Sequence, residues 1–190
     1  KRMELEEAVK GKLISVIGED TVTAYIEAVK AQSLLTEQTE ACRDMAIVYT
    51  PLNGTGLEPV TRVLKEMGYF NVHMVKEQEQ PDGTFPTCPY PNPEVPQAMD
   101  LGIALAGRLK GELLLATDPD CDRVGIAVKD GKGGYQRLSA NETGLLLLDY
   151  ICSRRKENGT MPAHPVMAKT IVTTALAETI AAHYGVQVVN

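Results

Sequence analysis

The chain has 190 residues, enough for one complete domain and part of a second, and a formal net charge of −6. Hydrophobic residues make up 44% and charged residues 23%, proportions that exclude a disordered chain and indicate a globular protein with a core. No window concentrates Lys and Arg, and no apolar run approaches the roughly 20 residues of a membrane span, so we expect neither nucleic acid nor a membrane as partner.

Helical and strand-like patterns alternate from the start of the chain. Residues 20–35 place apolar side chains at helical spacing behind Asp20, which predicts an amphipathic helix capped by that aspartate. A buried strand is predicted at 45–50. After it come a glycine-bearing loop, a second helix that Gly68 ends, and a short strand at 72–75.

The segment Pro81–Pro96 is rich in proline and predicts an extended surface loop. Residues 95–109 predict a helix, and 113–116 predict the next strand. The side chains aligned on the apolar face of that helix are Leu101, Ala104, Leu105 and Leu109. The order is βαβαβ, which predicts an α/β fold: a layered open sheet with flanking helices.

Strands at 124–128 and 135–138, joined by a glycine-rich turn, predict a hairpin at a domain margin. We therefore expect one α/β domain over 1–135 and the front of a second, incomplete α/β domain over 136–190.

In this second part Asn141 is expected to cap a helix, and 166–168 predict a strand. A helix is then predicted from Thr173 or Thr174 to Gly185, followed by a last strand. Because the chain stops directly after that strand, we expect it to be a piece of a longer polypeptide.

The strongest chemical signal is the turn 117–123, where Asp118, Asp120 and Asp122 stand at alternate positions. Three ionised carboxylates that converge repel one another and demand a cation, and ligands that are all oxygen favour a hard divalent ion such as Mg²⁺. The alternative for such a pattern alone is a solvated acidic turn. An EF-hand calcium loop is disfavoured because the positions that need Gly and Glu hold Arg123 and Lys129.

Arg123 directly follows the third aspartate, where its guanidinium could bind a phosphate held by the same ion; its alternative role is a local salt bridge to the acids. The loop 50–56 leaves the strand before it, so both loops are expected at the carboxyl edge of the sheet, where ligands bind. Its Gly54 and Gly56 could present N–H groups to an anion, although a plain strand-to-helix turn is favoured.

Other reactive residues form no recognisable machinery. The three histidines have no metal-ligand spacing, no serine has a nucleophile pattern, and Lys169 after the strand at 166–168 would by itself be assigned to the surface. The four cysteines contain no CxxC pair, which favours reduced thiols and a cytoplasmic protein.

Taken together, several segments resemble the α-D-phosphohexomutase family, the phosphoglucomutases and phosphomannomutases. The resemblance covers about residue 20 to the end, and its most specific element is Asp-Pro-Asp-x-Asp-Arg. The segments that carry it are Thr-Pro-Leu-Asn-Gly-Thr-Gly at 50–56, Phe-Pro at 85–86, Pro-Asn-Pro-Glu at 91–94, Ala-Thr-Asp-Pro-Asp-Cys-Asp-Arg at 116–123 and Asn-Glu at 141–142.

The resemblance implies the second of four domains, which bears the metal loop, and the start of the third. It implies that the three aspartates hold Mg²⁺ together with a phosphoserine oxygen from a first domain, that Arg123 lies beside that phosphoryl group, and that Lys169 is an active-site lysine. No Ser-His-Asn-Pro element and no sugar-selecting loop is present, so the piece is expected to be inactive alone. Asn53 stands where many members of the family have histidine.

The implied reaction is a Mg²⁺-dependent transfer of phosphate between the 1- and 6-positions of a hexose phosphate, through a phosphoserine and a bisphosphate intermediate. The chain leaves the sugar preference and the oligomeric state open. The alternative from a different functional class is a non-catalytic α/β module that binds a divalent cation for structure only.

Overall fold

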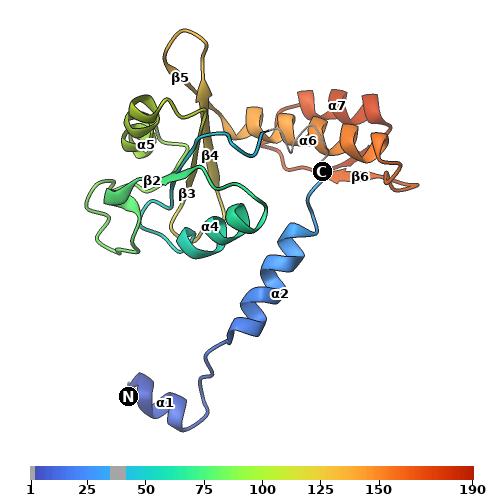
Figure 1. Cartoon of the computed structure of the whole chain (residues 1–190). Helices are drawn as coiled ribbons and strands as arrows, with labels where there is room; N and C mark the ends of the chain where they lie inside the picture. The colour runs from blue at the N-terminus through green and yellow to red at the C-terminus, as the bar shows by residue number, and fades with distance from the viewer. Residues whose placement is uncertain (1–2, 35–41) are drawn as a thin grey trace. The chain divides into compact units, whose positions relative to one another are not determined.

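The computed structural model describes residues 3–34 and 42–190, and the chain divides into two units, 1–33 and 34–190. The first unit contains α1 (Leu5–Lys10) and α2 (Glu19–Lys30) (Figure 1). The helix predicted over 20–35 is confirmed over Glu19–Lys30, and it ends before the predicted C-terminus. Its N-cap is Gly18, so the prediction of an Asp20 cap was wrong. Asp20 instead lies in the first turn, where the helix dipole favours a carboxylate.

The second unit is built on a five-stranded sheet in the order β2-β1-β3-β4-β5. The strands β2, β1 and β3 are parallel, and β4 and β5 continue the sheet as an antiparallel hairpin. Their bounds are β1 (Ile47–Thr50), β2 (Val72–Met74), β3 (Leu113–Thr117), β4 (Val124–Lys129) and β5 (Tyr135–Leu138). The predicted strands and the α/β fold class, an open sheet with flanking helices, are confirmed.

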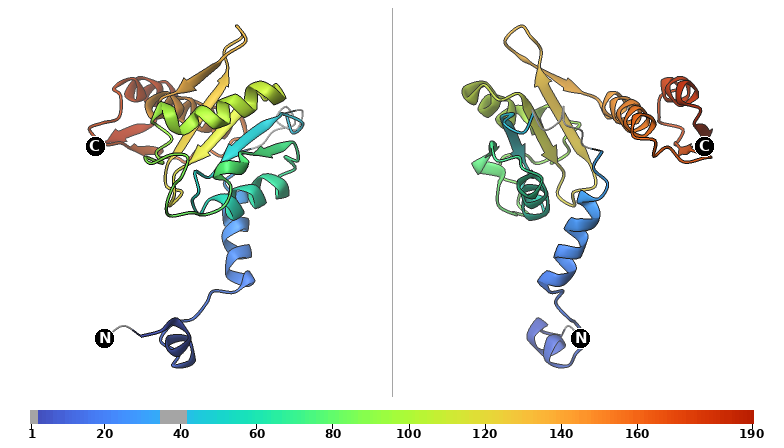
Figure 2. Two further views of the ribbon diagram at one scale, coloured as in Figure 1. Left: turned by 90° about the vertical axis from the view of Figure 1, so that its left-hand side faces the viewer. Right: turned by 45° about the vertical axis from the view of Figure 1, so that its right-hand side comes forward.

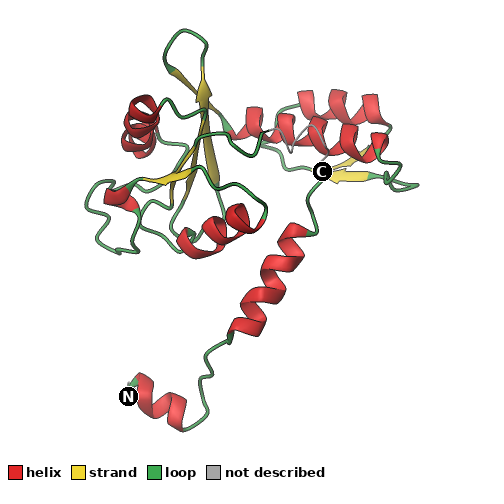
Figure 3. Ribbon diagram, in the orientation of Figure 1, coloured by secondary structure: helices red, strands yellow, loops and turns green. Residues whose placement is uncertain are grey.

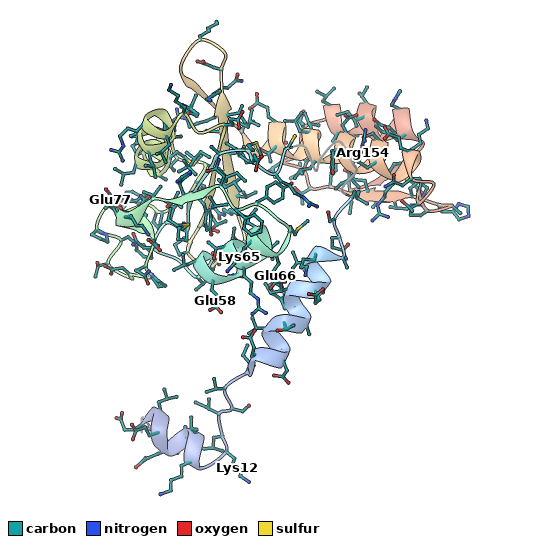
Figure 4. All side chains as sticks on the ribbon, in the orientation of Figure 1. Lys12, Glu58, Lys65, Glu66, Glu77 and Arg154 are labelled. Carbon is teal, nitrogen blue, oxygen red and sulfur yellow. The ribbon has the colours of Figure 1, made fainter. Side chains whose placement is uncertain are left out.

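The helices α4 (Leu57–Glu66) and α5 (Pro96–Leu109) connect the parallel strands, with the short 3₁₀ helix η1 (Lys76–Gln78) after β2. The crossovers from β1 to β2 and from β2 to β3 run in opposite directions along the sheet, so right-handed connections put α4 and α5 on opposite faces. In Figure 2, left, α5 lies across the strands. The exposed side of α4 carries Glu58, Lys65 and Glu66 (Figure 4).

The face that α5 buries differs from the predicted one. Its buried residues are Ala98, Met99, Gly102 and Ala106, whereas Leu101 and Leu109 are exposed. A Cβ on Gly102 would lie 2.6 Å from Leu114 Cδ1, so the small residues allow α5 to approach β3 closely. Apolar residues recur at helical spacing on both faces of α5, so periodicity alone does not say which face is buried. The face with the small residues is buried because it can approach the sheet more closely.

The last part of the chain adds two helices and a separate sheet of two parallel strands (Figure 3). The elements are α6 (Ala140–Glu157), β6 (Val166–Ala168), α7 (Leu176–Tyr184) and β7 (Gln187–Val189). Cys152 of α6, Ala181 of α7 and Val186 form their own core cluster. The five-stranded sheet continues to Leu138, three residues past the predicted boundary at 135, and the boundary itself stays a prediction. None of the described helices is long and apolar enough to cross a bilayer.

The start of α6 corrects a second capping prediction. Ser139, not Asn141, is the N-cap: its hydroxyl accepts a hydrogen bond from the Glu142 N–H, and the Glu142 carboxylate accepts one from the Ser139 N–H. This reciprocal capping box satisfies two N–H groups that a helix start leaves unpaired. Asn141 lies inside the helix, and its side chain bonds to the loop before α7.

The capping box predicts a pH dependence of stability. Hydrogen bonds from Ser139 lower the pKa of Glu142 below its ordinary value, because they favour the charged carboxylate. A lowered folded-state pKa means that the stabilisation is present above the unfolded pKa and is lost as the pH falls through the folded pKa. We expect Glu142→Gln to flatten the acid limb of a plot of unfolding free energy against pH. An acid limb identical to that of the wild type would contradict the assignment.

Candidate metal and phosphate site

Two loops meet at the carboxyl edge of the parallel strands. Because β1 and β3 are adjacent and parallel, loops 50–56 and 117–123 leave the sheet at the same edge, as predicted. The Thr55 N–H donates to the Pro119 carbonyl at 2.8 Å, and the Thr55 hydroxyl donates to the same oxygen at 3.0 Å. The first loop therefore supports the second directly.

Gly54 and Gly56 make this close approach possible. A Cβ on Gly54 would lie 2.3 Å from Pro119 Cα, and one on Gly56 would lie 2.5 Å from the Tyr49 hydroxyl oxygen. The N–H groups of Gly54 and Thr55 donate to the carbonyls of Pro51 and Pro119. The Gly54 and Thr55 N–H groups are therefore used inside the protein and are not available to an anion. The prediction that the Gly56 N–H could face an anion stays a prediction.

Asp118 organises the acidic loop. It is 7% exposed, and its Oδ1 accepts hydrogen bonds from the N–H groups of Asp122 at 3.0 Å and Arg123 at 2.9 Å. The Asp118 carbonyl accepts a further bond from the Cys121 N–H at 3.0 Å. These bonds fold the loop back on Asp118 and, within the described part of the chain, they leave Asp118 Oδ2 free of backbone hydrogen bonds.

The three predicted ligands come together. Asp118, Asp120 and Asp122 each offer a carboxylate oxygen, and these three atoms lie within 4.8 Å of one another. Repulsion from Asp120, and then from Asp118, raises the pKa of Asp122 above its ordinary value. Three convergent, mutually repelling oxygens are the donor set that a hard divalent cation such as Mg²⁺ prefers, so these residues fit the predicted ion.

Arg123 lies beside the acids. Its Nε is 3.7 Å from Asp118 Oδ2 and 3.9 Å from Asp122 Oδ1, and its side chain is 53% exposed. Contacts this long at an exposed position hold the guanidinium near the cluster without consuming its donors. Arg123 therefore has N–H groups left for an anion that approaches the same edge.

Cys121 occupies a strained position inside the acidic loop, since its φ is 62°. A left-handed conformation costs a residue with a side chain about 1 kcal/mol relative to glycine, and more when the side chain is β-branched. We expect Cys121→Gly to leave the thermal midpoint unchanged or raise it slightly, and Cys121→Val to lower stability by about 2 kcal/mol. Equal midpoints for the two variants would show that the backbone conformation is not a constraint.

Two buried polar pairs support the edge and were missed by the sequence patterns. The Tyr49 hydroxyl and Thr117 Oγ1 share a hydrogen bond of 2.9 Å between β1 and β3, and burial raises the pKa of Tyr49 to about 12. Thr50 Oγ1 donates to Gln78 Oε1 at 2.8 Å and accepts from the Leu52 N–H. The sequence signal that could have indicated these pairs is the polar residues at the ends of apolar strands: Tyr49 and Thr50 in β1 and Thr117 in β3.

Asn53 has a structural position in this sequence. It adopts φ 59°, and its amide donates to the Gln80 carbonyl at 2.8 Å while its own N–H donates to the Gln78 carbonyl. Asparagine tolerates the left-handed region better than most residues. The residue is 7% exposed, so its side chain anchors the 50–56 loop to the segment after β2.

Lys169, the remaining predicted site residue, lies outside the acidic cluster. It follows β6, and its Nζ is 3.1 Å from Glu178 Oε1 of α7. The structure thus brings Asp118, Asp120, Asp122 and Arg123 together, whereas the ion pair of Lys169 is made within the last part of the chain.

This fold and this edge define an α/β domain that presents a carboxylate cluster and an arginine at the carboxyl ends of parallel strands. Residues 23–133 match the family described as phosphoglucomutase/phosphomannomutase, alpha/beta/alpha domain II, which is more than half of the chain. The chain therefore belongs to the phosphoglucomutase/phosphomannomutase family, as its motifs suggested.

Named relatives agree with this assignment. A Haemophilus influenzae protein named "Probable phosphomannomutase" is 38% identical over 90% of this chain and 33% of its own length. A phosphoglucomutase of Staphylococcus saprophyticus is 35% identical over 87% of this chain and 32% of its own length. The chain thus spans about a third of the curated relatives that it matches.

A solved structure supports the fold. The crystal structure of a phosphoglucomutase/phosphomannomutase family protein from Burkholderia thailandensis matches 88% of this chain and 32% of its own chain, with a TM-score of 0.65 and 22% identity.

Proposed function

We propose that this chain is the central part of an enzyme that moves phosphate between the 1- and 6-positions of a hexose phosphate. The single observation that carries the proposal is the convergence of three carboxylate oxygens within 4.8 Å, with Arg123 beside them, at the carboxyl edge of the sheet. Membership of the family supports the substrate class. We also propose the domain boundary at 135 and a cytoplasmic location.

In this proposal Asp118, Asp120 and Asp122 hold the divalent ion, with Mg²⁺ proposed from the oxygen-only donor set. When bound, that ion would supply Lewis-acid polarisation of a phosphoryl oxygen. Arg123 would bind and orient the phosphoryl group through its free N–H donors. The loop 50–56 contributes by holding the acidic loop in place, through Thr55 and Pro119. These roles suit phosphoryl transfer, where catalysis is mostly positioning and charge neutralisation.

The chain contains no residue set that we assign as the phosphate-carrying nucleophile. We therefore propose that the isolated chain is inactive and that a phosphoserine comes from another domain of the complete polypeptide. The test is mutase turnover of hexose 1-phosphate by that polypeptide, with and without Asp120→Ala. We expect a loss of at least about a hundredfold. The matched control is Glu112→Ala. Glu112 is an exposed acid that directly precedes β3, at the end of the strand opposite to the acidic loop. Retained turnover in Asp120→Ala would reject the proposal.

The alternative, a non-catalytic module with a structural cation, has a simple discriminator. A structural ion adds its binding free energy to folding, so EDTA would lower the melting temperature of the isolated chain substantially. In the mutase proposal the site needs a further ligand from another domain and binds weakly alone. We then expect chelation to change the melting temperature little.

A further inference from the structure

Lys169 lies at the carboxyl end of β6 in the second, smaller sheet. The strands β6 and β7 are parallel and are joined through α7, and Lys169 directly follows β6 at its carboxyl end. Its N–H donates to the Val189 carbonyl at 3.0 Å, which fixes its backbone to β7. Carboxyl ends of parallel strands are where open α/β sheets bind ligands.

Among the described residues, the amine of Lys169 forms an ion pair with one acid, Glu178. The Lys169 side chain is only 10% exposed, and its Nζ lies 3.1 Å from Glu178 Oε1. Glu178 is the acid in the first turn of α7, where the helix dipole favours a negative charge. An ammonium group with so little access to water needs a counter-charge, and Glu178 supplies it. An ammonium group carries three N–H donors, and in the part of the chain that the structure describes this ion pair is the one interaction that it makes, so donors remain for a ligand.

A cavity of about 420 Å³ adjoins this pair. Polar residues from three segments line it: Glu94 before α5, Asn141 on α6, and Lys169 and Thr173 beside β6. Asn141 also fixes the loop after Lys169, because its Oδ1 accepts a hydrogen bond from the Thr174 N–H at 2.9 Å. The rest of the lining is largely apolar and includes Leu145, Leu148, Met167 and Val172. The four polar residues are therefore the ones that offer side-chain hydrogen bonds to a hydroxylated anion in this cavity.

We propose that Glu178 is a positioning residue that holds the Lys169 ammonium at this cavity, ready to bind a phosphate oxygen of a hexose phosphate. The inference rests on the proposed function, since it names the group that Lys169 meets. Glu178 acts through Lys169 and does not contact the ligand itself.

The first test measures Lys169 directly. We expect Glu178→Gln in the complete polypeptide to increase the rate at which acetic anhydride acetylates Lys169, read by mass spectrometry, at least about threefold, because the ion pair no longer shields the amine. The matched control is Glu157→Gln, which removes the same charge from a different ion pair, that with Arg154 on α6. An unchanged acetylation rate would overturn the positioning role, whether or not the polypeptide is a mutase.

The second test separates positioning from folding. We expect Glu178→Gln and Lys169→Ala each to raise KM for hexose 1-phosphate about tenfold with little change in kcat. The conservative variant Glu178→Asp should have a KM between those of Glu178→Gln and the wild type. The double variant should have the same KM as Lys169→Ala, because Glu178 acts through Lys169. A merely structural ion pair would lower the amount of active enzyme and leave KM unchanged, which contradicts the inference. Wild-type polypeptide without turnover would reject the proposed function, while the acetylation test still decides the role of Glu178.

Discussion

Replacing Gly54 by alanine is expected to lower the stability of the chain by about 3 kcal/mol, because the added methyl group has no space. Its Cβ would lie 2.3 Å from Pro119 Cα and 2.6 Å from the Pro119 carbonyl oxygen. Both are backbone atoms, which cannot rotate away as a side chain does. The 50–56 and 117–123 loops must separate, and the two hydrogen bonds from Thr55 to Pro119 break.

The measurement is the denaturant midpoint of Gly54→Ala beside Gly107→Ala. Gly107 lies in α5, and a Cβ there meets nothing within 4 Å, so this control gains helix propensity and stabilises by up to about 1 kcal/mol. The same backbone movement would displace Asp118 and Asp120, which flank Pro119. We therefore also expect Gly54→Ala to weaken divalent-ion binding by the complete polypeptide. Equal midpoints for Gly54→Ala and the wild type would show that the loops are not in contact.

Asp118→Ala is expected to destabilise the chain by about 3 kcal/mol, unlike removal of the other two acids. Asp118 Oδ1 accepts two backbone hydrogen bonds, and the residue is almost fully buried. Hydrogen bonds to a charged acceptor contribute about 1.5–3 kcal/mol each, and part of the loss is recovered when repulsion among the acids falls. Asp118→Asn keeps an acceptor oxygen, so we expect a smaller loss.

Asp120→Ala is the matched comparison. Asp120 is exposed, and in the described part of the chain no backbone N–H is assigned to its carboxylate. Its removal relieves repulsion, so the stability of the chain without a cation should stay unchanged or rise, while divalent-ion binding by the complete polypeptide falls. Urea unfolding and calorimetric titration with Mg²⁺ separate the two effects. Equal free energies of unfolding for Asp118→Ala and Asp120→Ala would contradict the idea that Asp118 stabilises the loop while Asp120 serves ion binding alone.

Local patterns were sufficient for much of the fold and of the site. Alternating periods predicted the strands of the large sheet and the helices between them, because a half-buried element imposes its own repeat on the chain. The three aspartates and Arg123 all lie within residues 118–123, so one tight turn brings them together and their spacing alone indicates a cation site. The sequence motifs also indicated the phosphoglucomutase/phosphomannomutase family, and the family match over residues 23–133 confirms that assignment.

Contacts between distant segments decided the rest. The face that α5 buries is set by packing of Gly102 against Leu114, which belongs to β3, the strand that follows the helix in the chain. The helical repeat alone does not determine this face. The role of Gly54 depends on its contact with Pro119. The neighbouring Thr55 bonds to the same proline, which lies 64 positions later in the chain. The choice of Ser139 over Asn141 as cap followed from where β5 ends and from the loop that Asn141 holds. Periodicity and spacing act over a few residues, whereas packing of one surface against another selects among patterns that are locally equivalent.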